Sequence, residues 1–324
     1  GVLALSVGAV FLNAAIPADA AAGGYAWSES AAFAPDLGPS AEMGEDGLRI
    51  LILTDQHYTR VFGDGKTDRL ADALIRDERP DLILLLGDQC FTPFNRSAYK
   101  RLIAFMDARK IPWAAIFGNH DEQGKATKNL LADMLSKSEY CLFRYGPNNI
   151  GGAGNYFVRL TSGGRDVHTL YFLDSTVKKD GHYQPPTEGQ VRWYEWAVRG
   201  MAAEAGGVVP STLLIHIPLP EYAAAYDAAA ANGGVVYGQR REKECASDVN
   251  SGLFEKIGGL GSTKGVFCGH DHVNDYSVMH EGVRLTYALS SGFGSYGDRN
   301  VKGGTVLTVR PDGATEQAQV FFKG

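Results

Sequence analysis

Cysteine is scarce in this chain. Only four cysteines occur among 324 residues, at positions 90, 141, 245 and 268, and no two of them form a C-x-x-C pair. This number and spacing exclude a small disulfide-stapled domain and argue against a zinc knuckle or a dithiol redox site. The disulfide state of Cys90, Cys141, Cys245 and Cys268 stays open at this point.

An excess of positive charge is also missing. The formal net charge is −6 at pH 7, and the one local basic cluster, residues 240–243, is interrupted by Glu242. Proteins dedicated to nucleic-acid binding usually present a basic face or stripe. We therefore expect no nucleic-acid partner.

The chain also lacks an apolar run near its start that is long enough for a membrane span. Val2 to Leu12 is apolar, but a transmembrane helix needs about 20 such residues. Ala18-Asp19-Ala20 has the small-x-small form of a signal-peptidase site, although no Lys or Arg precedes Arg49. The pattern favours the tail of an export signal, and thus a periplasmic or extracellular location. An alanine-rich extension on a cytoplasmic protein is the alternative.

The character of the sequence changes at about residue 49. Residues 13–47 are rich in Ala, Gly, Ser and Pro with little periodicity, whereas strand-like apolar runs begin at Arg49. We interpret residues 1–48 as an export-signal-like, low-complexity segment and residues 49–324 as the folded part. No internal repeat of fixed period is present.

The folded part begins with alternating strand and helix patterns. Continuous apolar runs at 49–55, 81–88 and 113–121 predict buried strands, with amphipathic helices over 66–77 and 95–109 between them. This alternation indicates a βαβαβ unit with parallel strands. The second half predicts further strands at 155–160, 168–175, 212–218 and 265–272, helices at 187–205 and 248–257, and closing antiparallel strands at 284–290, 304–310 and 318–322.

Polar side chains follow five of the predicted strands, at the point where each strand ends. They include five of the eight histidines of the chain, and the whole set is Asp55, His57, Asp88, Asn119, His120, Asp121, His216, His270 and His272. In open α/β sheets, ligands bind at the carboxyl ends of the strands, and adjacent strands lie only about 4.8 Å apart. Each buried polar group without a partner costs about 1–3 kcal/mol, and a bound pair of cations removes that cost. Each fragment alone is a weak signal, but their ordered occurrence indicates a metal site.

The ordered motifs D-x-H, G-D, G-N-H-D, a lone His and G-H-x-H resemble those of the calcineurin-like metallophosphoesterase superfamily, from Arg49 to the C-terminus. HIPLPEY at 216–222 and FCGHDHVND at 267–275 are similar to the branch related to purple acid phosphatases of bacteria, fungi and plants. The resemblance implies an α/β fold, a four-layer αββα sandwich of two mixed β-sheets flanked by helices. Because the matching residues run from Asp55 to His272, it also implies one catalytic domain over residues 49–324.

The same resemblance implies a role for each motif residue. Asp55, His57 and His272 bind one metal ion, while Asn119, His216 and His270 bind a second. Asp88 bridges the two, and Asp271 points away to hold its loop. Carboxylates and imidazoles suit Mn, Fe or Zn. A hydroxide shared by the ions attacks phosphorus.

His120 is the fifth motif histidine. The resemblance implies that it protonates the leaving oxygen and that Asp121 orients its ring. A role as a hydrogen-bonding residue beside the metal ligands is the alternative.

Two positions depart from the pattern of the family. Purple acid phosphatases have an iron-binding tyrosine three residues after the bridging aspartate, where this chain has Phe91. Related proteins often have an arginine in the glycine-rich stretch after the last motif, where this chain has Leu289. Residues 292–296 either line the substrate pocket or form a tight turn between strands.

The predicted activity is that of a dinuclear-metal-dependent phosphohydrolase, above all a phosphomonoesterase acting on a small phosphorylated substrate or a phosphoprotein. A phosphodiesterase or nucleotide pyrophosphatase of the same superfamily is the first alternative, and a non-catalytic binding module with this fold is the second. The substrate-binding residues, the substrate, the physiological metals and the oligomeric state stay open.

Overall fold

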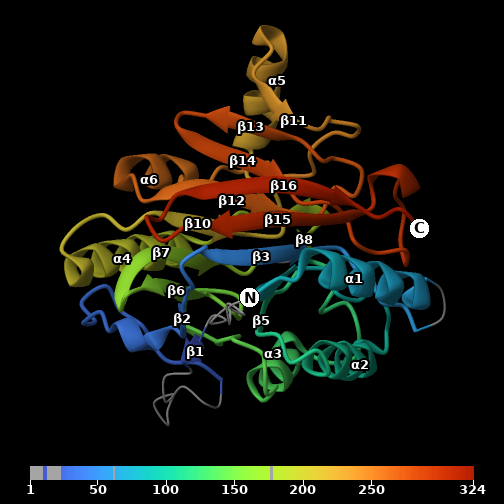
Figure 1. Cartoon of the computed structure of the whole chain (residues 1–324), viewed down its shortest axis with the longest axis horizontal. Helices are drawn as coiled ribbons and strands as arrows, with labels where there is room; N and C mark the ends of the chain where they lie inside the picture. The colour runs from blue at the N-terminus through green and yellow to red at the C-terminus, as the bar shows by residue number, and fades with distance from the viewer. Residues whose placement is uncertain (1–9, 13–22, 61–62, 176–177) are drawn as a thin grey trace, which may run out of the picture.

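The computed structural model describes residues 10–12, 23–60, 63–175 and 178–324. Most of its strands form two sheets (Figure 1). The larger sheet has nine strands, in the order β1-β2-β6-β7-β10-β12-β14-β13-β11. Their bounds are β1 Val10–Leu12, β2 Ser40–Glu42, β6 Tyr156–Ser162, β7 Arg165–Phe172, β10 Ser211–Leu214, β11 Val235–Tyr237, β12 Thr263–Cys268, β13 Ser277–His280 and β14 Val283–Tyr287.

The second sheet has five strands, in the order β16-β15-β3-β4-β5. Their bounds are β3 Leu48–Leu53, β4 Leu82–Leu86, β5 Trp113–Ile116, β15 Gly303–Val309 and β16 Thr315–Phe321. Strands β3, β4 and β5 run parallel, and helices α1 (Asp64–Glu78) and α2 (Asn95–Asp107) connect them. This confirms the predicted βαβαβ unit. A short two-stranded ribbon, β8 (Lys178–Lys179) with β9 (His182–Tyr183), lies apart from both sheets.

Six α-helices of the described part cover the outer faces of the two sheets. Helix α1 packs on β3 and β15, and α2 packs on α3 (Lys128–Ser136). Helix α4 (Glu188–Ala205) lies on β7, α5 (Glu221–Asn232) on β13 and α6 (Leu253–Leu260) on β12. Figure 1 shows α1 and α2 to one side of the strands and α4 and α6 to the other. The four-layer α/β prediction is confirmed.

Two apolar cores result from the alternation of side chains along the central strands. Leu214 and Phe267 point into the core between the two sheets, whereas their chain neighbours Leu213 and Val266 point toward helices α4 to α6. Successive residues of a strand face opposite sides of a sheet, so a strand covered on both faces is apolar throughout. This is why the central strands appear in the sequence as continuous apolar runs.

The prediction of closing antiparallel strands is confirmed for β15 and β16 and in part for β14. The segment at 284–290 was expected to be a closing antiparallel strand, but β14 runs parallel to β12. Strand β13, which the sequence did not reveal, comes first and forms an antiparallel hairpin with β14. Glu281 and Gly282 both have positive φ in the turn of that hairpin, so the chain reverses once more than expected.

Helix α5 is a second difference. The sequence predicted no helix between residues 205 and 248, but residues 221–232 are helical. Helix α5 buries only Tyr222, Ala225 and Ala229, and alanine has high helix propensity but little hydrophobic contrast. A helix whose buried stripe is mostly alanine leaves a weak periodic signal in the sequence.

The described part of the N-terminal segment packs against the nine-stranded sheet. Strand β2 pairs in parallel with β6, and Trp27 contacts the ring of Trp196 on α4 with ring centroids 5.9 Å apart. Most of the expected export signal, residues 1–9 and 13–20, lies outside the described residues. The boundary at residue 48 and the single domain over 49–324 therefore stay predictions. Within the described ranges, no helix combines the length and the apolar character that crossing a membrane requires.

A buried histidine away from the strand ends links the two sheets and makes stability depend on pH. His168 on β7 donates from Nδ1 to the Gly313 carbonyl at 3.2 Å, and its Nε2 lies 2.9 Å from the Thr212 hydroxyl. Burial lowers the pKa of His168 to about 4. The unfolded chain, with an ordinary pKa near 6.5, therefore takes up this proton at a higher pH than the folded protein does.

We expect the His168 contribution to stability to be complete above pH 6.5 and to be lost as the pH falls toward 4. The total loss is about 3 kcal/mol, since one pKa unit corresponds to about 1.4 kcal/mol. Urea unfolding of the wild type and of His168→Gln at several pH values measures it. The free-energy difference between the two proteins should shift in favour of the variant as the pH falls. Parallel pH profiles for the two proteins would contradict the assignment.

Candidate metal centre

The polar side chains predicted at the strand ends do lie together, because β3, β4, β5, β10 and β12 all end at one edge of the sandwich. Four of them, Asp55, His57, Asp88 and His270, have positive φ. Together they make up four of the nine non-glycine residues with this conformation in the described part of the chain. Positive φ is unfavourable for residues with a Cβ and is concentrated at functional sites. The backbone is therefore shaped to turn these side chains inward.

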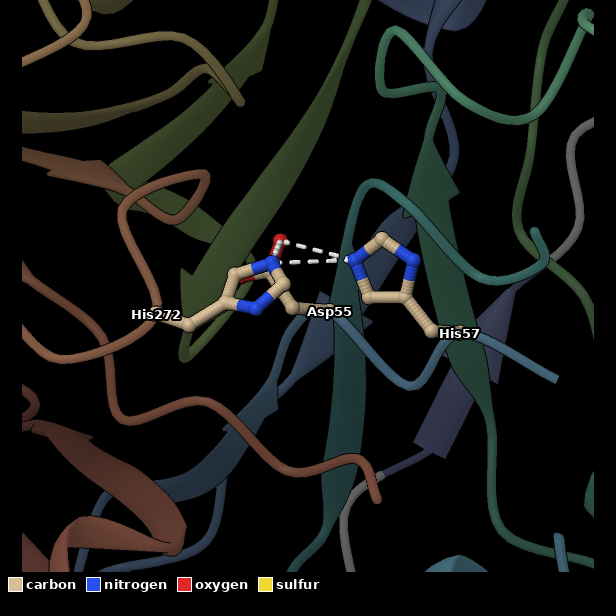
Figure 2. A group of neighbouring side chains, drawn as sticks. All are labelled: Asp55, His57 and His272. Carbon is tan, nitrogen blue, oxygen red and sulfur yellow. Dashed lines mark hydrogen bonds and ion pairs between the residues drawn. The ribbon is translucent and has the colours of Figure 1, made fainter. Parts of the chain in front are cut away.

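The first group of donors consists of Asp55, His57 and His272 (Figure 2). The His57 and His272 Nε2 atoms lie 3.0 Å apart, and Asp55 Oδ1 lies 3.3 Å from His272 Nε2 and 3.7 Å from His57 Nε2. Two donors bound to one ion at about 2.1 Å lie roughly 3.0–3.4 Å apart at octahedral or tetrahedral angles. Two of the three distances fall in this range and the third, 3.7 Å, is slightly longer, so the group suits a shared cation.

The second group consists of Asp88, His216 and His270. Asp88 Oδ2 lies 3.2 Å from His216 Nε2 and 3.6 Å from His57 Nε2 in the first group. This oxygen therefore lies between the two groups, within reach of both. Asn119 follows β5 next to His120, whose backbone N–H donates to Asp88 Oδ1 at 2.8 Å.

Backbone carbonyls set the tautomers of two candidate ligands. His272 donates from Nδ1 to the Tyr296 carbonyl at 2.8 Å, and His216 donates from Nδ1 to the Leu86 carbonyl at 2.8 Å. A carbonyl can only accept, so in each neutral ring the lone pair is on Nε2, the atom that faces the group. A hydrogen bond of this kind on the distal nitrogen is typical of metal-binding histidines.

Several of the buried polar atoms at the site lack hydrogen-bond partners. Among the described residues, five buried atoms of the two groups and their neighbour have none, namely His57 Nδ1, Asp88 Oδ2, Asn119 Oδ1, His216 Nε2 and His270 Nε2, and Asp88 Oδ2 and His216 Nε2 lie 3.2 Å apart as an ion pair. Leaving buried polar atoms unpaired is costly, and carboxylate, amide and imidazole donors together suit divalent or trivalent transition ions. The residues present fit a pair of such cations.

The electrostatics of Asp88 and His216 lead to the same conclusion. Burial by itself would raise the pKa of Asp88, but the neighbouring His216 and His57 hold that pKa well below its usual range. Burial would lower the pKa of His216, but Asp88 and Asp55 raise it to about 10. The His216 ring therefore carries a proton in the metal-free protein. A bound metal ion replaces that proton, because an imidazole ligand must be neutral.

His120 differs from these ligands in exposure and in partner. Its side chain is 29% exposed, whereas the side chains of Asp55, Asp88, His57, His216 and His272 are at most 4% exposed. Its Nδ1 lies 2.8 Å from Gln123 Oε1, and its Nε2 lies 4.0 Å from Asp88 Oδ2. His120 therefore stands at the rim of the group, with one nitrogen toward the candidate metal centre.

The expected pairing of Asp121 with His120 is wrong. Both Asp121 oxygens accept from backbone N–H groups, of Cys90 at 3.0 Å and Gly118 at 2.8 Å. Asp121 therefore joins the loops that follow β4 and β5, and Gln123 orients the His120 ring. The sequence contained a signal for Gln123, an amide three residues after His120, but not the backbone geometry that turns Asp121 away.

Asp271 belongs to neither of the two donor groups, although its carboxylate lies within 4.8 Å of ligand atoms of His270 and Cys245. It accepts from the Tyr287 hydroxyl at 2.6 Å and from the Cys245 backbone N–H at 3.1 Å.

All four cysteines are free thiols in the structure.

The glycine-rich stretch after β14 packs behind the first group. A Cβ at Gly292 would lie 2.2 Å from the Asp55 carbonyl oxygen, and one at Gly294 would lie 1.9 Å from the His57 carbonyl oxygen. The backbone of Asp55 and His57 therefore leaves no room for a side chain at Gly292 and Gly294. Ser295 and Tyr296, just beyond them, line a hollow. Leu289, where an arginine was considered, is fully buried.

A dimetal phosphatase from Danio rerio has a similar structure, with a TM-score of 0.53 at 12% identity, covering 86% of this chain and 100% of that chain. At this identity the likeness shows the fold alone.

The sequence model of the family described as Calcineurin-like phosphoesterase matches residues 48–274, and the chain belongs to this family. Two Arabidopsis thaliana relatives are named Probable inactive purple acid phosphatase 14 and 29. The first is 31% identical over 77% of this chain and 72% of its own length, and the second is 32% identical over 72% of this chain and 65% of its own. Phosphatase DCR2 of Saccharomyces cerevisiae is 31% identical over 76% of this chain and 45% of its own length.

Proposed function

We propose that this protein is a dinuclear-metal-dependent phosphomonoesterase. The observation that carries the proposal is the pair of donor groups joined by Asp88, in which several buried donor atoms lack a hydrogen-bond partner within the described structure. Membership of the calcineurin-like phosphoesterase family supports it. The proposed ligands are Asp55, His57 and His272 for one ion, Asn119, His216 and His270 for the other, and Asp88 for both.

Two such ions, when bound, supply charge stabilisation for the phosphoryl oxygens and an activated water. The residues of the chain set the charge around them. Asp55 and Asp88 bring two negative charges, whereas neutral imidazoles and the Asn119 amide bring none. The site therefore stays positive overall and favours a dianionic phosphomonoester.

His120 acts as the general acid in this proposal. Because the Gln123 amide oxygen accepts from Nδ1, the proton that moves is the one on Nε2, which faces Asp88. His120 holds this proton near the leaving oxygen and donates it as the P–O bond breaks. Gln123 is the positioning residue for the ring, and Asp121 supports the loop that carries it.

The names of two relatives include the word inactive, so a non-catalytic binding module is a second candidate. A module without catalysis tolerates the loss of ligands or of the acid. This chain retains all seven proposed ligands and His120, which favours the enzyme. Three further points stay predictions. They are export of the protein, a small phosphorylated substrate or a phosphoprotein as partner, and the absence of a nucleic-acid partner.

A hydrolysis panel on metal-stripped protein tests the proposal. It uses p-nitrophenyl phosphate, the bis ester and several nucleotides, each with Mn, Fe, Zn, Ca or Mg added back. We expect turnover of the monoester with a transition ion. A preference for the bis ester or for a nucleotide pyrophosphate would support the first alternative. Metal binding without turnover of any substrate would support the binding module.

Phe91 predicts the colour of the iron-loaded protein. The Phe91 ring lies 4.4 Å from the ring of His120 and 5.9 Å from that of His57, but a phenyl ring cannot bind iron. We expect no tyrosinate charge-transfer band in the visible spectrum of the iron-loaded wild type and a new band in Phe91→Tyr. Phe91→Leu is the matched control and should stay colourless. A band in the wild type would show that another tyrosine reaches the iron. Tyr58 is an unfavourable candidate, because its hydroxyl donates to Asp68 at 2.8 Å.

A further inference from the structure

A hollow of about 530 Å³ lies beside the first donor group, between the start of α1 and the segment that follows β14. Its lining is basic and contains the side chains of Lys66, Arg69, Arg299 and Lys302. The two pairs come from parts of the chain more than 200 residues apart, which the fold brings together.

The four cations of this hollow, called here the basic hollow, have no acidic partners. In the part of the chain that the structure describes, none of them forms an ion pair with a carboxylate. The nearby acids have other partners. Asp64 accepts from the backbone of Thr59 and Arg60 and pairs with Arg101, and Asp298 caps the short helix at Arg299–Val301. Within the described residues, the four cations therefore lack direct carboxylate partners, and only Lys302 feels carboxylates at longer range, those of Asp55 and Asp298.

Lys302 is the least expected member. Its side chain is buried, at 3% exposure, and within the described residues its ammonium group has one hydrogen-bond partner, the Ser290 hydroxyl at 2.7 Å. An ammonium group has three donors, and a buried charge without a counter-ion is costly. A buried and incompletely paired cation that faces a hollow suits a bound anion.

Tyr296 connects the basic hollow to the candidate metal centre. Tyr296 lines the hollow. Its ring stacks on the His272 ring with centroids 4.2 Å apart, and its backbone carbonyl orients that imidazole. Gly297, also in the lining, is so close that a Cβ there would lie 2.6 Å from Lys302 Nζ and 3.8 Å from His272 Cβ. The basic hollow is thus one side chain away from a proposed metal ligand.

We propose that the basic hollow is a subsite for a second phosphate group of the substrate, so that the preferred substrates are small bisphosphorylated molecules. The inference rests on the proposed function and adds the substrate class. Two guanidinium groups and two ammonium groups match a phosphate dianion better than a single carboxylate, because a phosphate offers more charge and bidentate acceptor geometry for arginine.

Alkanediol bisphosphates with three, four and six carbons, compared with the alkyl monophosphates of the same length, test the subsite in the metal-loaded protein. We expect kcat/KM to be about 10- to 100-fold higher for the best bisphosphate than for its monophosphate, with a lower KM. The preference should shrink as salt is raised from about 20 to 200 mM, because exposed charges are screened. The chain length with the largest preference measures the separation of the two sites.

The double variant Arg69→Gln/Arg299→Gln should lose most of this preference. The matched control is the double variant Arg76→Gln/Arg310→Gln. It also removes two positive charges, one from α1 and one directly after β15, but neither residue lines the basic hollow. Calorimetric binding of butane-1,4-bisphosphonate, which cannot be hydrolysed, provides a second measurement and should weaken only in the first double variant.

The outcomes separate the subsite from the proposed function. Bisphosphonate binding that depends on Arg69 and Arg299, without hydrolysis of any ester, would support the subsite and overturn the phosphatase. Hydrolysis of monophosphates with no preference for bisphosphates would support the phosphatase and overturn the subsite. An equal loss in both double variants would overturn it as well. A preference for an acidic phosphoserine peptide over every bisphosphate would also overturn the subsite, because the basic hollow would then bind an acidic group of a protein substrate.

Discussion

Asp88→Asn is expected to abolish phosphatase activity and to release metal from both sites. Asp88 is the residue whose Oδ2 lies within 3.6 Å of ring nitrogens in both donor groups. The amide has nearly the same shape but no charge, and it offers only one oxygen. Loss of several kcal/mol of charge stabilisation corresponds to a rate loss of more than about 10³-fold. Elemental analysis should show well under two ions per chain.

Asp121→Asn is the matched control for this experiment. Asp121 is as fully buried as Asp88 and lies on the neighbouring loop, but its oxygens accept from backbone N–H groups. It should keep the metal stoichiometry of the wild type, although the fold loses a little stability. Two ions at full occupancy and retained activity in Asp88→Asn would disprove the bridging role. Equal metal loss in both variants would show that burial of a carboxylate, and not its position, determines the effect.

His120→Ala is expected to separate substrates by the basicity of their leaving groups. An alkoxide leaving group is strongly basic and needs a proton as the P–O bond breaks, whereas p-nitrophenolate leaves without one. Positioned general-acid catalysis contributes about 10²–10⁴-fold. The variant should therefore lose that factor on an alkyl phosphomonoester and much less on p-nitrophenyl phosphate.

Metal content and a second variant complete this test. His120 belongs to neither donor group, so His120→Ala should retain both ions. Gln123→Leu, which removes the partner of Nδ1, should show the same substrate dependence with a smaller loss. Equal losses on both esters would point to substrate positioning instead of proton transfer. Loss of metal in His120→Ala would make this residue a ligand.

Much of the fold could be predicted because the strands are buried on both faces. Strand β4 is apolar throughout, and β3, β10 and β12 each end in an apolar run. Each of the four strands is followed within two residues by a metal-binding residue type. Those two signals are local, and they reinforce each other along the chain. The missed elements include α3, β11, β13 and α5. The reason is clear for β13 and α5, because a four-residue strand and an alanine stripe leave little hydrophobic pattern.

The sequence by itself determined the family, the order of the strands that end in candidate ligands, and the identity of those candidates, because each motif lies within a few consecutive residues. Only the tertiary structure decided which donors face one another, that Gln123 and not Asp121 orients His120, and that Lys66 and Arg69 meet Arg299 and Lys302 in one basic hollow. These contacts join residues on different loops, and in the last case residues more than 200 positions apart. Their distances depend on how loops bend at positive φ and how sheets pack, which no local pattern encodes.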